Sequence, residues 1–299
     1  MSGLGGWFRG LPESRQGVLW IVGATVLFLG MDAMAKELAQ SLPVVQIVWA
    51  RYAFSLVLIA LMLGRRLPRI ATTANPLLQW VRAGLLLSTT TSFYVGLAYI
   101  PLAEATAITF LGPLIVTGLS VPLLGEKVGV RRWIGVACGF LGALVVIRPG
   151  AGFLDWAALY PLAAATGFAF VQIITRHIRH SDHPLTTLFY TSLVGAVLTT
   201  PAIPFFWTAP DAFGWTLLLL LGLFGIVGHY GMIKSLQKAQ VSVLAPFHYT
   251  SLFWATLFGF VFFGDFPDAW TIVGALIVAA SGLYVIHRER VRAREKTPD

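Results

Sequence analysis

The sequence predicts an all-α integral membrane protein in which ten transmembrane helices form two inverted five-helix repeats (5+5). Three observations support this fold class: an apolar composition, ten runs of membrane-spanning length, and an internal repeat. Of the 299 residues, 57% are hydrophobic and only 11% are charged, whereas a soluble domain carries about a quarter charged residues. Lipid cannot hydrogen-bond an open backbone, so only helices or a closed barrel can span a bilayer, and long continuous runs favour helices.

Ten apolar runs define the predicted spans. A span needs about 20 apolar residues, so a chain of 299 residues has room for ten spans and short connecting loops. The runs cover residues 17–36, 44–64, 78–99, 103–123, 131–148, 154–175, 185–206, 213–234, 241–263 and 269–287. The loops between them are too short for a soluble domain, so we expect nearly all of the chain to lie in the bilayer.

An internal repeat relates the two halves of the chain. In the first half, Ala103–Thr106 opens an apolar run that ends at Leu124–Glu126. In the second half, Ala239–Ser242 opens a run that ends at Phe263–Asp265. The second run starts 136 residues after the first and ends 139 residues after it. The offset between matching positions of the two halves therefore differs by only three residues, as expected for a duplicated unit.

The number of spans in each repeat predicts the relative orientation of the repeats. Because five is odd, the second repeat must enter the membrane from the opposite side. We expect residues 1–150 to form the first repeat, starting in the cytoplasm, and residues 151–299 to form the inverted second repeat, ending there. Inverted repeats are typical of secondary transporters, which hold their substrate near the bilayer midplane between the halves.

The positions of the basic residues predict the topology. The net charge is +8, and all but three of the 21 Lys and Arg residues fall on one side of the membrane in this arrangement. Lys36 and Arg148 fall on the other side, and Arg51 lies within a span. Because loops rich in Lys and Arg remain in the cytoplasm, both termini are predicted to be cytoplasmic. The basic tail is interpreted as a topology anchor, so the charge does not indicate a nucleic-acid partner.

An ordered set of short motifs runs through the end of the first half. In order, the motifs are Pro101 with Ala103 and Ala105, Pro113, Leu123–Glu126, Trp133 with Gly135, Gly139 with Gly142, and Val146–Ile147 before Pro149. This set resembles the repeat of the drug/metabolite transporter superfamily, in its EamA-type ten-helix branch. The second half departs from the pattern, because Gly264-Asp265 stands for the Gly-Glu pair and Leu252 stands opposite Pro113.

The resemblance implies a carrier of the bacterial inner membrane that moves small metabolites by alternating access, often outward. Within the superfamily, the chain resembles exporters of aromatic and other neutral amino acids, so amino-acid export is the expected activity. A multidrug exporter, or an exporter of another metabolite, is the alternative within the same superfamily. The expected partners are a small-molecule substrate and the lipid bilayer, no cofactor is expected, and both a monomer and a dimer remain open.

Helix geometry predicts a polar and aromatic cluster near the bilayer midplane. At about 1.5 Å per residue, Ser88–Ser92 lies roughly 15–21 Å into its span, Pro113 roughly 15 Å, and Tyr249–Trp254 roughly 12–20 Å. Pro113 and Pro246 each free a backbone carbonyl in the preceding turn. The expected substrate-binding residues are Ser88, Ser92, Tyr94, Tyr99, Thr109, Pro113, Phe168, His229, Pro246, His248, Tyr249 and Trp254.

These residues also have plain structural interpretations. The hydroxyls of Ser88–Ser92 can bond their own helix backbone. Five consecutive positions exceed one helical turn, however, so at least one of them must face the bundle interior. Pro113 can act only as a packing kink, and Tyr249 and Trp254 can serve only to fill the bundle. The sequence leaves both interpretations open.

Ionisable residues within spans are candidates for function because burying them in lipid is costly. Asp32 lies about 22 Å from the cytoplasmic start of its span and Arg51 about 10 Å from the outer end of the next span, so the two are at similar depth and able to pair. Such a pair would either join two helices or take part in coupling. His229 and His248 could couple transport to protons or remain neutral and hydrogen-bonded. A metal site would need a third ligand at the depth of these two histidines, and the sequence offers none, so no metal site is predicted.

Three classes of function compete: a carrier, a membrane enzyme and a channel. An enzyme needs converging acids, a metal set or a nucleophile with its base, whereas the acids here are scattered, as at Asp32 and Glu104. A channel would more often show a symmetric ring or a filter loop. The predicted midplane holds aromatic rings and hydroxyls and little fixed charge. That composition favours a carrier for a small amphipathic solute, with amino acids as the leading class.

The topology prediction can be tested with reporter fusions. A fluorescent protein fused to the C-terminus should fluoresce, and alkaline phosphatase fused there should be inactive, because both termini are expected in the cytoplasm. The control is a phosphatase fusion in a loop expected on the opposite side, such as 265–268, which should be active. An active phosphatase at the C-terminus would contradict the inverted arrangement.

Overall fold

The computed structural model of this chain describes residues 11–112, 114–116, 118–119, 130–147, 156–178, 181–239, 244 and 247–295, in which every regular element is a helix. The first half contains α2 (Glu13–Leu38), α3 (Val44–Leu63), α5 (Pro76–Leu97), α6 (Leu102–Thr109) and α8 (Val130–Ile147). The second half contains α9 (Leu159–Ile178), α10 (Pro184–Thr199), α12 (Ala212–Lys238), α14 (Thr250–Phe263) and α15 (Ala269–Glu295). Short helical segments lie between them: η1 (Gly64–Arg66), α4 (Leu67–Ala71), η2 (Trp156–Ala158), η3 (Thr200–Ala202) and α11 (Ile203–Phe206).

Each of the ten predicted spans coincides with a helix in the described residues, which confirms the all-α class. The fourth span departs most from its predicted length. Its helix α6 ends at Thr109, four residues before Pro113, whose ring would clash with the Thr109 carbonyl in a continuing helix. The next amide, that of Phe110, donates to the Ala107 carbonyl three residues back. Pro113 and Pro246 themselves lie outside the described residues.

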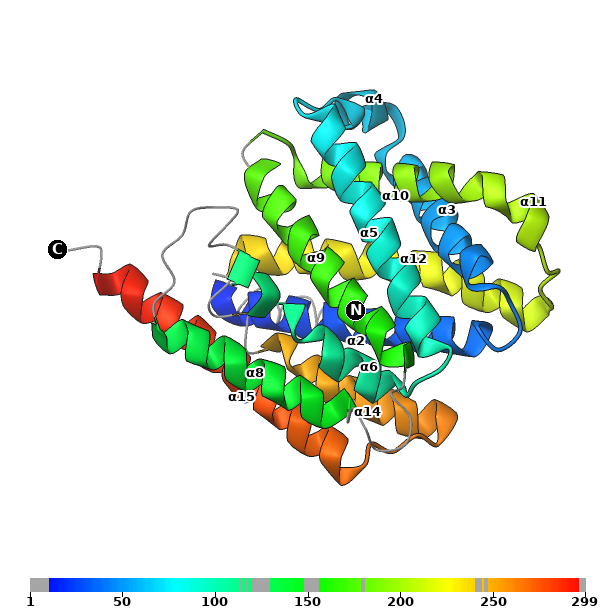
Figure 1. Ribbon diagram of the computed structural model, residues 1–299. Coiled ribbons are helices and arrows are strands. Elements are labelled where there is room, and N and C mark those ends of the chain that lie inside the picture. Colours follow the sequence, from blue (N-terminus) through cyan, green and yellow to red (C-terminus); the bar gives the residue numbers. More distant parts are fainter. Residues whose placement is uncertain are drawn as a thin grey trace.

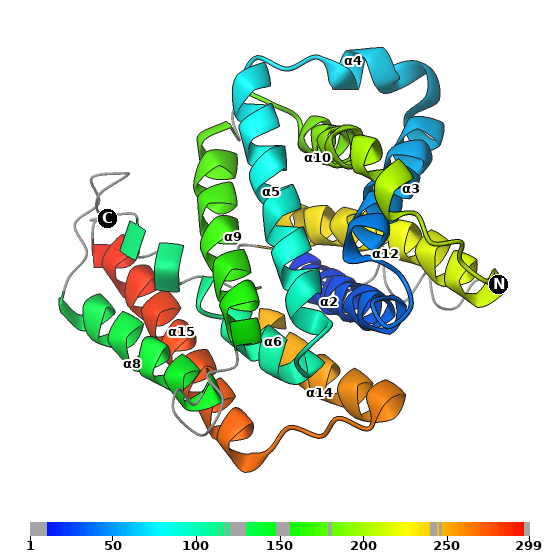
Figure 2. The same cartoon turned by 45° about the vertical axis from the view of Figure 1, so that its right-hand side comes forward.

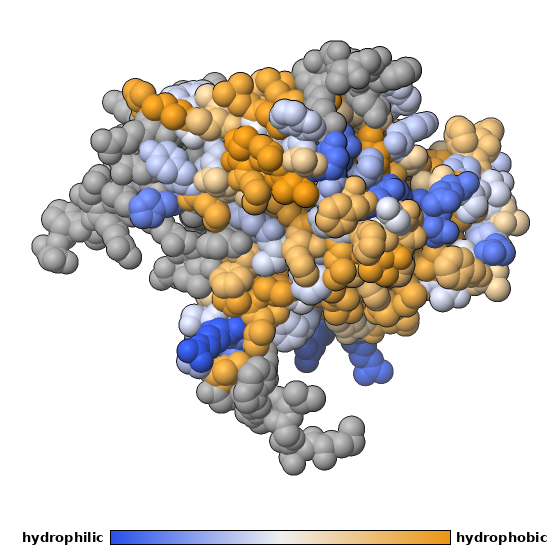
Figure 3. Space-filling view, turned by 90° about the horizontal axis from the view of Figure 1, so that it is seen from below, coloured by the Kyte–Doolittle hydropathy of each residue, from blue (hydrophilic) through white to orange (hydrophobic). Residues whose placement is uncertain are grey.

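The described helices are long and apolar enough for a membrane protein. Five of them could cross a bilayer by length and composition: Glu13–Leu38, Val44–Ala71, Trp156–Thr175, Pro184–Phe206 and Ala212–Ser235. Shorter apolar helices include Trp133–Ile147, Thr250–Phe263 and Ala269–Tyr284. Apolar side chains also cover much of the face seen in Figure 3, as expected for a surface in contact with lipid.

The two repeats pack through matching contacts. The first helix of each repeat lies against the third helix of the other, so α2 packs on α12 and α9 packs on α5 (Figures 1 and 2). The second helices, α3 and α10, pack on each other, as do the fifth helices, α8 and α15. The fourth helices α14 and α6 contact α2 and α9, the first helices of the opposite repeats. This matching is the pattern of two repeats related by a pseudo-twofold axis, and the polar interior lies where the crossed pairs meet.

Glycines allow α8 and α15 to touch along their backbones. A Cβ atom at Gly142 would lie 2.8 Å from the Ile277 side chain, and one at Gly274 would lie 2.6 Å from the Gly142 carbonyl oxygen. Ser281 on α15 donates a hydrogen bond to the Gly135 carbonyl of α8. Small residues of this kind allow close helix packing in membranes, and here they hold the fifth helices of the two repeats together.

Polar side chains tie the repeats together at the end of the bundle that carries α4. Asp182, between α9 and α10, accepts hydrogen bonds from Thr73 (2.6 Å), the Ala74 amide (3.1 Å) and Gln79 (2.7 Å). Burial by itself would raise the pKa of the Asp182 carboxyl, but the bonds from Thr73, Gln79 and Ala74 outweigh it and lower the pKa below its usual value. Asp182 is therefore ionised near neutral pH and anchors the start of α5.

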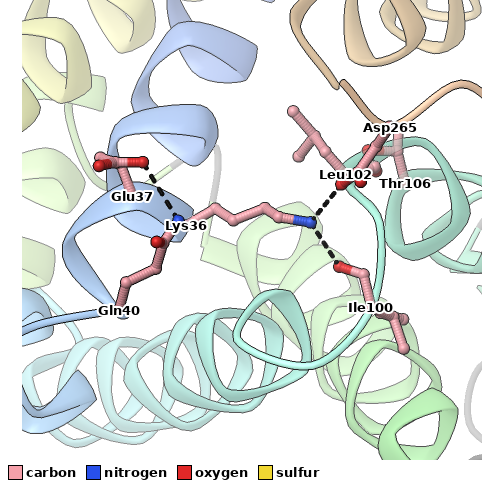
Figure 4. Close-up of polar contacts among 7 residues, drawn as sticks. All are labelled: Lys36, Glu37, Gln40, Ile100, Leu102, Thr106 and Asp265. Atoms are coloured by element: carbon pink, nitrogen blue, oxygen red, sulfur yellow. Dashed lines mark hydrogen bonds and ion pairs between the residues drawn. The ribbon is translucent and has the colours of Figure 1, made fainter. Parts of the chain in front are cut away.

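A salt bridge ties the repeats together at the opposite end. The Lys36 ammonium of α2 lies 2.8 Å from the Asp265 carboxylate and donates to the Ile100 carbonyl at 3.1 Å (Figure 4). The Phe263 ring lies below the same ammonium, 5.1 Å from its centroid. The Lys36 side chain is only 14% exposed and that of Asp265 33%. This contact joins residues 229 positions apart and closes α2 against the end of α14.

The turn after α14 explains why Asp265 reaches Lys36. Gly264 has a φ of 70°, in the left-handed region that glycine adopts without strain. The Gly264 amide donates to the Phe260 carbonyl and the Asp265 amide to the Gly259 carbonyl, so both bond back to the last turns of α14 and close the helix. The Gly-Asp pair of the second repeat thus ends a helix and supplies a partner for Lys36.

We expect the Lys36–Asp265 contact to stabilise the fold measurably. Lys36→Met or Asp265→Asn alone should lower the free energy of unfolding by about 1–3 kcal/mol, because each leaves the other group partly buried without its charged partner. The Lys36→Met/Asp265→Asn double variant should lose less than the sum of the single losses. Thermal unfolding of the detergent-purified variants measures these differences.

The exposed pair of Lys238 and Glu13 provides the matched control. Its atoms lie 2.6 Å apart, but the two side chains are 34% and 72% exposed, so Lys238→Met should lower the free energy of unfolding much less than Lys36→Met does. Equal losses at the two pairs, or additive losses at Lys36 and Asp265, would contradict this interpretation.

Candidate functional site

A polar cluster lies inside the bundle where α2, α3 and α5 meet. Its centre is Arg51 of α3, which is only 9% exposed. The guanidinium donates to the Thr90 hydroxyl of α5 at 3.2 Å, and the Tyr52 and Thr90 hydroxyls share a hydrogen bond of 2.8 Å. The guanidinium carbon also lies 5.3 Å from the Tyr52 ring centroid and 5.6 Å from that of Tyr94. Arg51 is therefore held by one hydroxyl and two aromatic faces.

The direct ion pair between Asp32 and Arg51 that the sequence allows is not formed in the described part of the chain. The Arg51 guanidinium points to Thr90 and the two tyrosine rings instead. Asp32 nevertheless lies near enough for the two charges to interact electrostatically. The bundle interior thus holds two opposite charges that are close but not in contact. A buried charge without an ionic partner is costly, so this arrangement is a candidate for function.

Several buried polar atoms have no hydrogen-bond partner among the described residues. They include the Tyr94 hydroxyl, the Trp254 indole nitrogen and the Tyr249 hydroxyl. Most buried polar atoms in proteins are hydrogen-bonded, so such exceptions mark positions where a ligand or water can bind. Tyr94 is a member of the main hydrophobic core and Trp254 packs against the same core. These two residues, which the sequence predicts as substrate-binding, therefore belong to one packed region.

Tyr249 occupies a different position within the bundle. Its ring stacks on Phe110 with 4.7 Å between centroids, and its hydroxyl lies against Gly282 of α15 where a side chain would otherwise be. It therefore lies at the contact of α6, α14 and α15. Thr109, at the end of α6, donates its hydroxyl to the Thr106 carbonyl at 2.7 Å, which satisfies that hydroxyl locally.

The hydroxyl run of α5 divides between three environments. Thr90 is 5% exposed and faces the Arg51 cluster. Thr91 donates to its own helix, at the Leu87 carbonyl, and Thr89 lies against Gly167 of α9. The two predicted members of the run, Ser88 and Ser92, are exposed and half-buried respectively. The interior hydroxyl is thus Thr90, four residues before Tyr94 on the same helix face.

Two predicted aromatic residues lie at the periphery of the described structure. Tyr99 is 60% exposed and packs on Trp156 beyond the end of α5, with 5.0 Å between ring centroids. Phe168 is 40% exposed on α9. Both rings are therefore exposed, and neither belongs to the buried cluster around Arg51 that the sequence leads us to expect. On a helix that is apolar all round, periodicity does not distinguish the lipid face from the interior.

The two predicted histidines also differ in their surroundings. The His229 ring on α12 bonds through Nδ1 to the Gly225 carbonyl at 2.7 Å and meets the edge of the Phe28 ring, 4.9 Å between centroids. His248 is exposed, and its backbone carbonyl accepts from Ser251. The contacts of His229 fit the structural interpretation of a hydrogen-bonded histidine.

Arg82 is an interior cation that the sequence places among the cytoplasmic basic residues. Its side chain turns into the bundle instead, donating to Thr175 of α9 at 2.6 Å and to Thr191 of α10 at 2.9 Å. It therefore links α5 to two helices of the other repeat. Tyr52 and Thr90 are not among the site residues predicted from the sequence. Thr90 could have been found, because it lies four residues before Tyr94 and therefore on the same face of α5.

One described hollow is too apolar to be this site. It has a volume of about 230 Å³ and is lined by Leu111, Leu114, Ile115, Gly118, Leu119, Val136 and Phe140. Its lining offers no polar side chain to orient a substrate. The polar cluster around Arg51, together with Tyr94 and Trp254, remains the candidate site.

Comparison with known proteins identifies relatives over nearly the whole chain. The chain is 28% identical over 280 residues to an S-adenosylmethionine uptake transporter of Rickettsia bellii, covering 94% of this chain and 96% of that protein. It is 27% identical over 283 residues to a riboflavin transporter of Rhizobium johnstonii, covering 93% of each chain. It is also 27% identical over 274 residues to a pseudopaline exporter of Pseudomonas aeruginosa, covering 89% of this chain and 94% of that protein.

The fold and the family are supported by two further comparisons. A solved crystal structure matches with a TM-score of 0.65 at 17% identity and covers 95% of this chain and 99% of that chain. The sequence matches the EamA-like transporter family twice, over residues 15–148 and 155–287. The chain therefore belongs to the EamA-like transporter family and is a multi-pass membrane transporter of metabolites built from two EamA repeats, not an enzyme.

Proposed function

We propose that the chain carries a small amphipathic metabolite with an aromatic ring across the bacterial inner membrane by alternating access. The observation that carries this proposal is the unpaired Tyr94 hydroxyl and Trp254 indole nitrogen in one packed interior region. The aromatic rings there offer stacking surface, and the free polar atoms offer a donor and an acceptor for the substrate. A wholly apolar drug would leave these atoms unsatisfied.

Two substrate classes fit this chemistry. Amino acids, aromatic ones included, are the class expected from the sequence. S-adenosylmethionine is the second candidate, because relatives at 28% identity are transporters of that compound and it joins an adenine ring to an amino-acid group. Aromatic amino acids and S-adenosylmethionine both join an aromatic ring to the same α-amino-acid head group. Transport measurements can separate them.

The polar ties at the two ends of the bundle support alternating access. The Asp182 hydrogen bonds join α5 to the loop between α9 and α10, and the Lys36 salt bridge joins α2 to the end of α14. Each tie links one repeat to the other at one end only. Release of one tie while the other holds would open the interior to one side of the membrane. The direction of net transport then follows the substrate gradients.

The proposed function can be tested with purified protein in liposomes. Vesicles preloaded with unlabelled phenylalanine or S-adenosylmethionine should accumulate the same labelled compound transiently, by saturable counterflow. Unlabelled competitor should abolish the uptake, and protein-free vesicles are the control. Flux of lipophilic cations without competition by either compound would instead assign the chain to multidrug export.

Substitutions that remove single polar atoms should weaken transport. Tyr94→Phe and Trp254→Phe should each raise KM about five- to tenfold, because each removes one hydrogen bond of about 1 kcal/mol or slightly more to the substrate. Tyr249→Ala is also expected to reduce transport. Counterflow at several substrate concentrations gives KM for each variant.

The control for these variants is Tyr99→Phe. Tyr99 carries the same hydroxyl but is 60% exposed at the end of the bundle, so its KM should not change. Normal transport by the Tyr94, Trp254 and Tyr249 variants together would show that the substrate binds elsewhere.

A further inference from the structure

The separation of Asp32 and Arg51 is the least explained feature of the bundle interior. Arg51 donates to Thr90, and most of its other N–H groups have no acceptor among the described residues. Asp32 has no hydrogen bond or ion pair in the described part of the chain, although its charge lies within electrostatic range of Arg51 and Tyr94. If the two charges served only to hold α2 to α3, direct contact would compensate them best.

Three other ionisable side chains inside the bundle, Lys36, Arg82 and His229, already have partners. Lys36 is bound to Asp265 and the Ile100 carbonyl. Arg82 donates to two threonines, and His229 bonds to the Gly225 carbonyl. Among the described interior groups, Asp32 and Arg51 are thus the opposite charges that remain available to a ligand.

We propose that Arg51 and Asp32 bind the two ends of a zwitterionic head group, the carboxylate at Arg51 and the ammonium at Asp32. The planar guanidinium matches a carboxylate through two parallel hydrogen bonds, and the Asp32 carboxylate accepts from an ammonium. Tyr94, whose ring centroid lies 5.6 Å from the guanidinium carbon of Arg51, supplies a further polar contact through its hydroxyl. This assignment rests on the proposed function and specifies the substrate class as α-amino acids and their S-adenosyl derivatives.

Substrate analogues that lack one charge test the assignment directly. In wild-type counterflow of labelled phenylalanine, unlabelled phenylalanine should compete well. Phenethylamine, which lacks the carboxylate, and 3-phenylpropionate, which lacks the ammonium, should each compete at least about tenfold less well, because each loses a charge-assisted hydrogen bond. If S-adenosylmethionine is the transported compound, its decarboxylated and deaminated forms replace these two analogues.

Variants should change the selectivity as well as the rate. Arg51→Gln should remove the preference for phenylalanine over phenethylamine, and Asp32→Asn should remove the preference over 3-phenylpropionate. Arg51→Lys and Asp32→Glu retain the charges and should retain the preference for the zwitterion. A generally damaged protein would lose transport of all compounds in proportion, so a change in selectivity distinguishes binding from folding.

Two matched controls lie outside the cluster. Glu37→Gln makes the same change as Asp32→Asn on the same helix, at a side chain that bonds only to Gln40 among the described residues. Arg65→Gln removes an exposed arginine just after α3. Both should keep the wild-type selectivity.

The outcomes separate the head-group site from the transport function. Wild-type counterflow in which all three competitors act alike would overturn the head-group site while leaving the transporter assignment intact, and so would unchanged selectivity in folded Arg51→Gln and Asp32→Asn variants. If those variants fail to fold, the wild-type competition alone decides. Absence of wild-type counterflow with both phenylalanine and S-adenosylmethionine would overturn the proposed function, and the head-group site with it.

Discussion

The bilayer requires every backbone amide and carbonyl of a span to be satisfied within its own helix, and the rest of this structure depends on that constraint. The backbone is therefore unavailable for recognition along most of the chain, and side chains must carry it. Their polar atoms can lie only where helices shield them from lipid. The Arg51 cluster lies at such a place, where α2, α3 and α5 meet and the second repeat packs alongside.

The helix packing of the two repeats is symmetric, whereas the polar side chains in the interior are not. The main contacts between repeats occur in matching pairs, such as α2 with α12 and α9 with α5. The side chains in the interior do not follow this rule. Helix α3 carries Arg51, whereas its counterpart in the second repeat, α10, contains no arginine; apolar residues such as Leu188 and Phe189 stand there instead. A duplicated fold can in this way bind a substrate whose two ends differ.

The sequence predicts the fold far better than the site. Apolar runs define the spans because lipid imposes a minimum length, and depth along a helix selects Tyr94 and Trp254 as candidates, whose polar atoms have no partner among the described residues. Depth does not give the direction of a side chain, however, so Tyr99 and Phe168 are predicted inside but are exposed, while Arg82 turns inward. The contact of Arg51 with two tyrosine rings, and the salt bridge from Lys36 to Asp265, depend on how distant helices pack. Neither is visible in local patterns.

The backbone contact between Gly142 and Gly274 has a consequence for how the protein can evolve. A side chain added to either glycine would meet the opposite helix, so neither repeat can alter this position without an accommodating change in the other. The two halves arose as copies of one unit, yet at this crossing they are no longer free to diverge independently. The contact between α8 and α15 therefore constrains the sequences of both repeats at the same time.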